Sequence, residues 1–230
     1  MTHQFPSPFL VIEASSSAGS IALVVDDVVA AERSVILGPS RDDALLPAIA
    51  EALREAQVSP RAVRAIACGS GPGSFTSLRI AASLAKGMAV ANDATLYAIP
   101  SLLLAAAVLK NKPGLYLLHA DALRSERYAV RVTVDIDGAL SMSAVMRMTL
   151  DDAAALAAHE RALLVAVGGA SAAGHDTLIV QPHARNVVVL ASMFNTFGPV
   201  SLESWEPDYG RLAEAQVKWE SAHGRVLPAG

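Results

Sequence analysis

Residues 69–79 read Gly-Ser-Gly-Pro-Gly-Ser-Phe-Thr-Ser-Leu-Arg, a glycine-rich turn between a short apolar strand and a long helix. The strand is expected at residues 64–68. After the turn, apolar and small side chains recur every three or four residues up to about Asn92, which is the period of an amphipathic helix. Glycine lets such a turn take positive φ angles and approach its neighbours closely. The stretch therefore predicts a strand, a tight loop and a helix.

The loop and the helix start that follows it are a candidate anion cradle, because the first turn of a helix leaves N–H groups unpaired. The spacing of Gly69, Gly71 and Gly73 is not the dinucleotide pattern G-x-G-x-x-G, and no G-K-[ST] follows as in a nucleotide P-loop. Pro72 also removes one N–H donor. The chemistry alone therefore leaves anion binding open. The candidate anion-facing or nucleotide-facing residues of this loop are Gly71, Gly73, Ser74 and Thr76.

The whole string closely resembles the signature of the bacterial TsaB family, also called YeaZ, which usually reads G-P-G-S-F-T-G-L-R-I and then A-K-G-L-A. Here the two parts are Gly71-Pro-Gly-Ser-Phe-Thr-Ser-Leu-Arg-Ile80 and Ala85-Lys-Gly-Met-Ala89. Ser77 departs from the family pattern, which has glycine at that place. The resemblance extends over nearly all of the chain. It includes Pro100-Ser101-Leu102, a charged run at 121–128, and Tyr209-Gly-Arg211 with Lys218-Trp219.

The first half of the chain predicts strands at 9–13, 20–25 and 28–36, a helix at 42–57, the signature strand and helix, a strand at 95–99 and a helix from about Ser101. Ser40 with Asp43 resembles a cap for the helix at 42–57. The order β-β-β-α-β-α-β-α is that of the actin-like or ribonuclease-H-like fold, which the resemblance also implies. The fold class is therefore α/β, with two subdomains that each hold a mixed sheet flanked by helices.

The second half has weaker periodicity. It predicts strands at 115–120, 128–135, 139–148, 163–167 and 177–180, and helices at 151–159 and 187–197. A turn-rich segment at 110–114 is the expected boundary between the halves. The predicted organisation is an N-terminal actin-like subdomain at 1–110, a degenerate C-terminal subdomain at 111–204 and a helical tail at 205–230.

Composition favours a protein outside the membrane, although the mean hydropathy of +0.39 is high. The longest apolar run, residues 102–109, is far shorter than the about 20 residues that span a bilayer, and no basic signal segment opens the chain. Cys68 is the only cysteine, which predicts an inert core thiol in a reduced, cytoplasmic protein. A net charge of −4 without a basic cluster gives no footprint for direct tRNA binding.

The first predicted hairpin is the other place to look for a nucleotide site, because actin-like ATPases carry an acidic residue and small hydroxyls there. Residues 13–20 read Glu-Ala-Ser-Ser-Ser-Ala-Gly-Ser, which makes Glu13, Ser15 and Ser17 candidates to face a phosphate and its metal. The family usually has Asp-x-Ser/Thr, so Glu13 places its carboxylate about one bond length further out, and metal sites are sensitive to such a change. A hairpin rich in turn-forming residues is the structural alternative.

Metal and nucleophile motifs are not found in this sequence. The catalytic relatives of the family bind a metal through a His-x-x-x-His pair on one helix face, but none of the six histidines here lie four apart. No G-x-S-x-G elbow occurs either. The charged cluster Asp121, Arg124, Glu126 and Arg127 is interpreted as a solvated turn or an interdomain ion-pair network. No catalytic residue and no metal ligand is therefore assigned.

Small side chains on nearly every side of the signature helix would let another helix approach closely, although a crowded core explains them equally well. The resemblance implies that the helices at 42–57 and 76–92 pack against the catalytic paralogue of the family, or against a second copy. The partner face predicted on these helices consists of Leu45, Ile49, Leu53, Phe75, Leu78, Arg79, Ala82 and Lys86.

The resemblance implies a non-catalytic scaffold or activating subunit. The complex it joins would install threonylcarbamoyl on the adenosine next to the anticodon of tRNAs that read codons beginning with A. The expected partners are the catalytic paralogue TsaD and the ATPase subunit TsaE, with ATP or ADP and a metal on those subunits and none on this chain alone. Contact with tRNA is expected to be indirect, and the isolated chain is expected to form a homodimer. The alternative is a stand-alone actin-like ATP-dependent phosphotransferase or a glycoprotease-type hydrolase.

Overall fold

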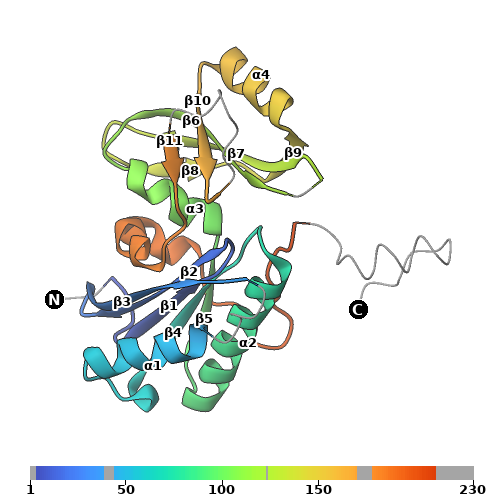
Figure 1. Ribbon diagram of the computed structural model, residues 1–230. Helices are drawn as coiled ribbons and strands as arrows, with labels where there is room; N and C mark the ends of the chain where they lie inside the picture. The colour runs from blue at the N-terminus through green and yellow to red at the C-terminus, as the bar shows by residue number, and fades with distance from the viewer. Residues whose placement is uncertain (1–3, 39–43, 123, 170–177, 211–230) are drawn as a thin grey trace, which may run out of the picture.

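The computed structural model describes residues 4–38, 44–122, 124–169 and 178–210, and Figure 1 shows two sheets placed one above the other. The first sheet has five strands in the order β3-β2-β1-β4-β5. Its strands are β1 (Phe9–Glu13), β2 (Ala18–Val25), β3 (Val28–Ile36), β4 (Ala65–Gly69) and β5 (Thr95–Ile99). β1 pairs with β2 antiparallel and with β4 parallel, so the sheet is mixed.

Helices cover both faces of the first sheet, which explains why β1 and β4 are apolar without alternation. The helices α1 (Leu45–Glu55) and α2 (Phe75–Asn92) pack on the face that presents Leu10 and Ile12. The opposite face presents Phe9 and Val11 to α3 (Ser101–Ala106) and to the 3-10 helix η3 (Ala184–Thr196). A short 3-10 turn, η1 (Pro60–Ala62), precedes β4.

The second sheet has the order β11-β10-β6-β7-β8, with β9 also paired to β7. One face carries α4 (Leu150–Glu160), and the other carries α3 with the 3-10 turn η2 (Ala107–Leu109). The strands of this sheet are β6 (Gly114–Asp121), β7 (Glu126–Val134), β8 (Leu140–Met142), β9 (Met146–Thr149), β10 (Leu163–Val167) and β11 (Leu178–Val180).

All six residues of α3 are buried because this helix lies between the two sheets. Leu103 and Leu104 pack on the first sheet, whereas Leu102 packs on the second. The apolar run at 102–109 is thus a buried connection between the sheets. Among the described residues, no helix is both long enough and apolar enough to cross a membrane.

The predicted α/β class with two mixed, helix-flanked sheets is confirmed, and the strands at 9–13, 28–36, 95–99 and 163–167 have the predicted bounds. The single strand predicted at 139–148 is wrong, because the chain leaves the ladder between β8 and β9. Opposite Arg131, the Ser143 Oγ accepts the Arg131 N–H at 3.0 Å in place of a backbone carbonyl.

Two helix predictions also need correction. The segment at 187–197 is a 3-10 helix that begins earlier, at Ala184, after His183 accepts the N–H of Arg185 on its ring Nδ1. Residues 205–210 are not helical, and the rest of the predicted tail lies outside the described residues. The proposed cap of Ser40 with Asp43 also lies outside them. Although η3 belongs to the second half of the chain, it packs on the first sheet, and the subdomain boundaries stay a prediction.

A matched pair of isoleucines tests the first core. Ile12 is completely buried in β1 between the sheet and α1 and α2, whereas Ile136 is 89% exposed in the turn after β7. We expect Ile12→Ala to lower the free energy of unfolding by about 2–5 kcal/mol, because it removes buried methyl groups and leaves a cavity. Ile136→Ala should change it by no more than about 0.5 kcal/mol. Urea unfolding followed by circular dichroism measures both, and equal losses would contradict this assignment of the core.

Candidate functional site

The signature loop at 70–74 links β4 to α2 and is enclosed by three other segments of the chain. The hairpin between β1 and β2 contacts it through the Ser74 N–H, which donates to the Ser15 carbonyl at 2.8 Å. The start of α3 contacts it through the Ser101 N–H, which donates to the Gly71 carbonyl at 3.1 Å. The segment before Gly210 contacts it through the Asp208 N–H, which donates to the Ser70 carbonyl at 2.8 Å.

The loop glycines are required by these contacts. A Cβ on Gly73 would lie 2.1 Å from the carbonyl oxygen of Ser15. Gly71 has a φ of +85°, and a Cβ there would lie 2.2 Å from the carbonyl oxygen of Asp208. These glycines therefore leave room for the protein's own backbone, at positions that the sequence offered as candidates for contact with an anion.

The structure brings most of the predicted anion-facing residues together, and two of their backbone donors are bonded within the chain. The N–H groups of Gly71 and Ser74 already donate to the Ser101 hydroxyl and the Ser15 carbonyl. Ser17 lies at the far side of the hairpin, where its carbonyl accepts the N–H of Leu37. Thr76 is exposed on the first turn of α2. Two N–H donors of the loop and part of its space are therefore used by the chain itself, and anion binding stays a prediction.

Glu13 is not on a ligand-facing surface, which corrects its predicted place. Its side chain is completely buried, and its carboxylate accepts the Ser15 N–H at 2.6 Å and the Ser101 hydroxyl at 2.8 Å. Burial raises the pKa of Glu13, and the hydrogen bonds from Ser15 and Ser101 oppose that shift. Sequence analysis missed Ser101, whose contact with Glu13 joins residues 88 positions apart.

Cys68 lies on β4, next to the Glu13 carboxylate, and is completely buried. Burial raises the pKa of its thiol. Its sulfur lies 3.6 Å from the Gly69 carbonyl, to which the S–H donates. A neutral, inaccessible thiol is a poor nucleophile, so the position fits the predicted inert core cysteine. Within the described ranges, His, Cys, Asp and Glu side chains form no group of three that could hold a metal ion.

The charged cluster around the turn between β6 and β7 forms its ion pairs within the second sheet. A guanidinium nitrogen of Arg127 lies 2.9 Å from the Asp121 carboxylate, and Glu126 lies 3.4 Å from Arg147 on β9. Arg124 is exposed at the turn, with a positive φ of 52°. The Arg127 side chain is mostly buried, so this cluster is only partly solvated.

Five of the eight residues predicted for the partner face are buried in this chain's own core, so that part of the prediction is wrong. The helices α1 and α2 use their most apolar stripes to cover the first sheet, which leaves these side chains without access to a partner. The buried residues are Leu45, Ile49, Leu53, Leu78 and Ala82. Phe75, Arg79 and Lys86 do reach the surface.

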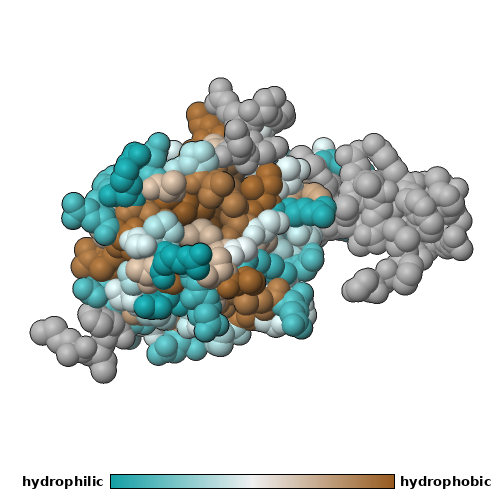
Figure 2. Space-filling model, turned by 90° about the horizontal axis from the view of Figure 1, so that it is seen from below, coloured by the Kyte–Doolittle hydropathy of each residue, from teal (hydrophilic) through white to brown (hydrophobic). Residues whose placement is uncertain are grey.

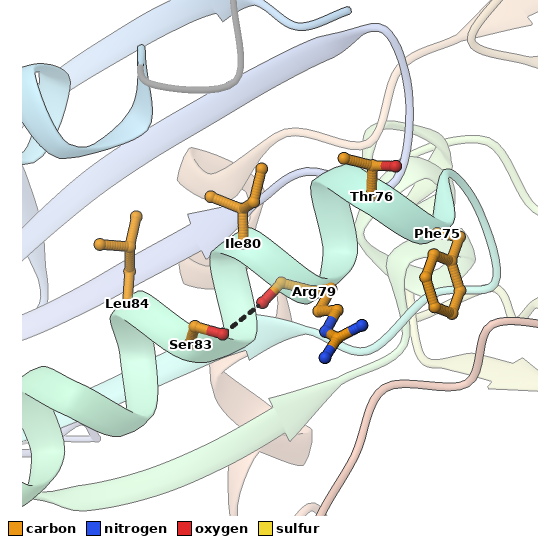
Figure 3. Close-up of a pocket in the computed structure, with 6 residues that line it drawn as sticks. All are labelled: Phe75, Thr76, Arg79, Ile80, Ser83 and Leu84. Carbon is orange, nitrogen blue, oxygen red and sulfur yellow. Dashed lines mark hydrogen bonds between the residues drawn. The ribbon is translucent and has the colours of Figure 1, made fainter.

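The surface of α2 carries a groove of about 410 Å³ lined by Phe75, Thr76, Arg79, Ile80, Ser83 and Leu84. Figure 3 shows Thr76, Ile80 and Leu84 in one row along the helix. Phe75 and Arg79 project from another side, and the Ser83 hydroxyl donates to the Arg79 carbonyl at 2.8 Å. We call this groove, with the exposed Gly87 and Val90 that follow it, the α2 outer face.

The α2 outer face is apolar at its centre and open. Val90 is 69% exposed, and nothing lies within 4 Å of a Cβ built on Gly87. Figure 2, which views the molecule from the side of α1 and α2, shows an apolar area bordered by hydrophilic residues. Sequence analysis missed Ile80, Leu84 and Val90 because it followed the stripe that the sheet buries. A second helical repeat, at positions 76, 80, 83, 84 and 87, was the sequence signal that could have identified this face.

Residues 205–210 form the flank of this face. The Phe75 ring packs against Tyr209 in a tilted arrangement with 4.6 Å between centroids, and the Lys86 ammonium lies 5.9 Å from the Trp205 ring centroid. The Tyr128 hydroxyl of the second sheet donates to the Tyr209 carbonyl at 3.3 Å. Residues 205–210 therefore connect the side of α2 to the second sheet.

Two mixed sheets joined by a buried helix, with a glycine loop after a central strand, define a protein of the actin-like ATPase fold class. A family model described as tRNA N6-adenosine threonylcarbamoyltransferase, TsaD, matches residues 41–157. The tRNA threonylcarbamoyladenosine biosynthesis protein TsaB of Bacillus subtilis (strain 168) is 27% identical over 229 residues, which cover 91% of this chain and 96% of that protein. The chain therefore belongs to the TsaD family, in its TsaB or YeaZ branch, as the signature predicted.

Two solved structures have the same fold. YeaZ from Pseudomonas aeruginosa aligns with a TM-score of 0.69 and 24% identity, over 86% of this chain and 97% of that chain. A structure described as an uncharacterized protein with similarity to peptidase YeaZ from Pseudomonas aeruginosa gives a TM-score of 0.74 and 24% identity. That alignment covers 90% of this chain and all of the other chain. The predicted actin-like fold is confirmed by these alignments.

Two glycines of the signature region provide a matched test of the enclosed loop. Gly73→Ala places a methyl group against the Ser15 carbonyl, so we expect it to lower the free energy of unfolding by more than about 1 kcal/mol. Gly87→Ala, at an open position in the middle of α2, should raise it by about 0.5–1 kcal/mol through the lower entropy of the unfolded chain. Chemical unfolding checks both signs. A neutral Gly73→Ala variant would show that the loop does not pack on the hairpin.

Proposed function

We propose that this chain is a non-catalytic subunit that supports a TsaD-type transferase in the biosynthesis of threonylcarbamoyladenosine in tRNA. The name of the Bacillus subtilis relative supports the pathway, and the match to the transferase family supports descent from a catalytic ancestor. The α2 outer face is the observation that carries the supporting role. It is an open apolar groove on the helix that bears the family signature.

The properties of the α2 outer face suit a protein partner. Protein interfaces combine an apolar centre with a polar rim, and aromatic and arginine side chains supply much of their binding energy. Ile80, Leu84 and Val90 provide the centre, whereas Phe75 and Arg79 stand at its edge. Ser83 and Gly87 leave room for a partner helix to approach closely. We propose that a TsaD-type subunit covers this face in the complex and that a second copy covers it in the isolated chain.

The remaining functions of the pathway are assigned to the partner subunits in this proposal. The signature loop uses its Gly71 and Ser74 donors internally, so ATP and a metal are proposed to bind the TsaD-type and TsaE-type subunits. With a net charge of −4, this chain offers little attraction for phosphate, and tRNA is proposed to bind through the partner.

A matched pair of arginine substitutions tests the partner face. Ser83 and Ala155 are both small, exposed helical residues, but Ser83 lines the groove and Ala155 lies on α4 of the second sheet. Ser83→Arg should weaken binding to a TsaD-type subunit at least about tenfold, because a long charged side chain would fill the contact. Ala155→Arg should bind as the unchanged protein does.

Calorimetric titration measures this affinity, and circular dichroism shows that both variants are folded. The same affinity for both variants would place the partner elsewhere. Substitutions at Leu78 or Ala82 do not test the face, because both side chains are buried in the core. Light scattering on the isolated chain should show a dimer that Ser83→Arg shifts toward monomer.

Reconstitution tests the supporting role. We expect transferase, ATPase subunit, ATP, threonylcarbamoyl adenylate as the donor, and tRNA to yield modified adenosine when this chain is present, with the yield falling at least about tenfold without it. Mass spectrometry of digested tRNA measures the product. Full activity without the chain would contradict the proposal. ATP-dependent phosphate transfer or peptide hydrolysis by the purified chain alone would instead support the stand-alone enzyme.

A further inference from the structure

We propose that Glu13 is a positioning residue whose buried carboxylate ties the β1–β2 hairpin and the start of α3 to the signature loop, and so sets where α2 begins. The part of this inference that concerns partner binding rests on the proposed function. The part that concerns the loop does not.

The contacts of Glu13 form a continuous chain of hydrogen bonds. One carboxylate oxygen accepts the Ser15 N–H at 2.6 Å, and the other accepts the Ser101 hydroxyl at 2.8 Å. The Ser101 oxygen in turn accepts the Gly71 N–H at 3.1 Å. Because Ser101 is completely buried, its hydroxyl is a relay between the carboxylate and the loop.

The space around the carboxylate fits glutamate in particular. A Cβ built on Gly69 would lie 1.9 Å from a carboxylate oxygen of Glu13 and 3.0 Å from the Ser101 oxygen. Glycine at the end of β4 therefore leaves the volume that the longer acidic side chain occupies. An aspartate at position 13 is one methylene shorter, so its carboxylate would be withdrawn from Ser101. The departure from the family pattern at this position thus has a structural use.

Two routes lead from Glu13 to the two ends of the loop. Through Ser101 it holds Gly71, near the end of β4. Through Ser15 it holds Ser74, the residue before α2, because the Ser15 N–H donates to Glu13 while the Ser15 carbonyl accepts the Ser74 N–H at 2.8 Å. A change at Glu13 should therefore reach the first turn of α2, where Phe75 and Thr76 line the groove.

The ionisation of Glu13 makes stability depend on pH, which a purely steric role would not do. Burial raises its pKa above the ordinary value of 4.5, and the titratable group that faces it is the Cys68 thiol on β4, whereas Ser15 and Ser101 contribute hydrogen bonds. A raised pKa means that the folded protein favours the protonated form. The contribution to stability is therefore present below about pH 4.5 and is lost as pH rises through the folded-state pKa.

The experiment uses Glu13→Gln, Ser101→Ala and their combination, with Ser17→Ala as the control in the same hairpin. Amide hydrogen exchange of Gly71 and Ser74 is measured by NMR on the isolated chain. Ser101→Ala removes one oxygen and keeps the backbone, so we expect exchange at Gly71 to become about tenfold faster or more. Because Glu13 and Ser101 act through one chain of hydrogen bonds, the double variant should raise the amide exchange rate only slightly more than the stronger single variant does. Ser17→Ala should leave both amides unchanged.

The pH dependence and the partner affinity complete the test. Relative to Glu13→Gln, which cannot ionise, the unchanged protein should lose urea midpoint as pH rises above about 4.5, because only the unchanged protein has to ionise a buried carboxylate. Unchanged exchange in both single variants, or additive effects in the double variant, would overturn the role of Glu13 in the loop.

Affinity of Ser101→Ala for a TsaD-type subunit should fall about tenfold. Altered loop exchange with unchanged affinity would overturn only the link from the loop to the α2 outer face. Failure of the Ser83→Arg test, with altered loop exchange here, would instead show that the proposed partner surface is wrong while Glu13 still positions the loop.

Discussion

The close contact between the β1–β2 hairpin and the signature loop is the constraint on which the rest of this structure depends. The Ser15 carbonyl accepts the N–H of Ser74, and a side chain larger than hydrogen at residue 73 would collide with it. The hairpin, the loop and the start of α2 are therefore one unit. In that unit two backbone donors of the potential anion cradle, the N–H groups of Gly71 and Ser74, are bonded to the chain itself.

Two further connections carry this arrangement across the molecule. The helix α3 is buried on all sides between the sheets, so both cores depend on its position. Residues 199–210 run from β5, where Val200 donates to the Leu96 carbonyl at 2.9 Å, past α2 to Tyr128 of the second sheet. The α2 outer face is consequently supported by both halves of the chain, as a surface for a rigid partner requires.

The two faces of α2 explain how one helix serves both the fold and an interaction. Its inner stripe, with Ala81, Ala85 and Ala89, is packed on the first sheet, whereas Ile80 and Leu84 are half-buried at the edge of that core and Val90 is exposed. Alanine and serine occur on both sides, so the helix has only a weak contrast between them. A weak contrast suits a helix that is covered by a sheet on one side and by a protein on the other.

The sequence by itself determined the class of fold, the family and most strands, because alternation, apolar runs and turn residues act over a few neighbouring positions. It also determined where the glycine loop and the signature helix lie. Only the tertiary structure decided which stripe of α2 faces the sheet, since Leu78 and Ile80 are equally apolar in isolation. The place of Glu13 was decided in the same way. Glu13 lies two residues before Ser15 in a hairpin, which predicts a polar site. Its contact with Ser101 and the space that Gly69 leaves for it exist only because the sheet brings these residues together.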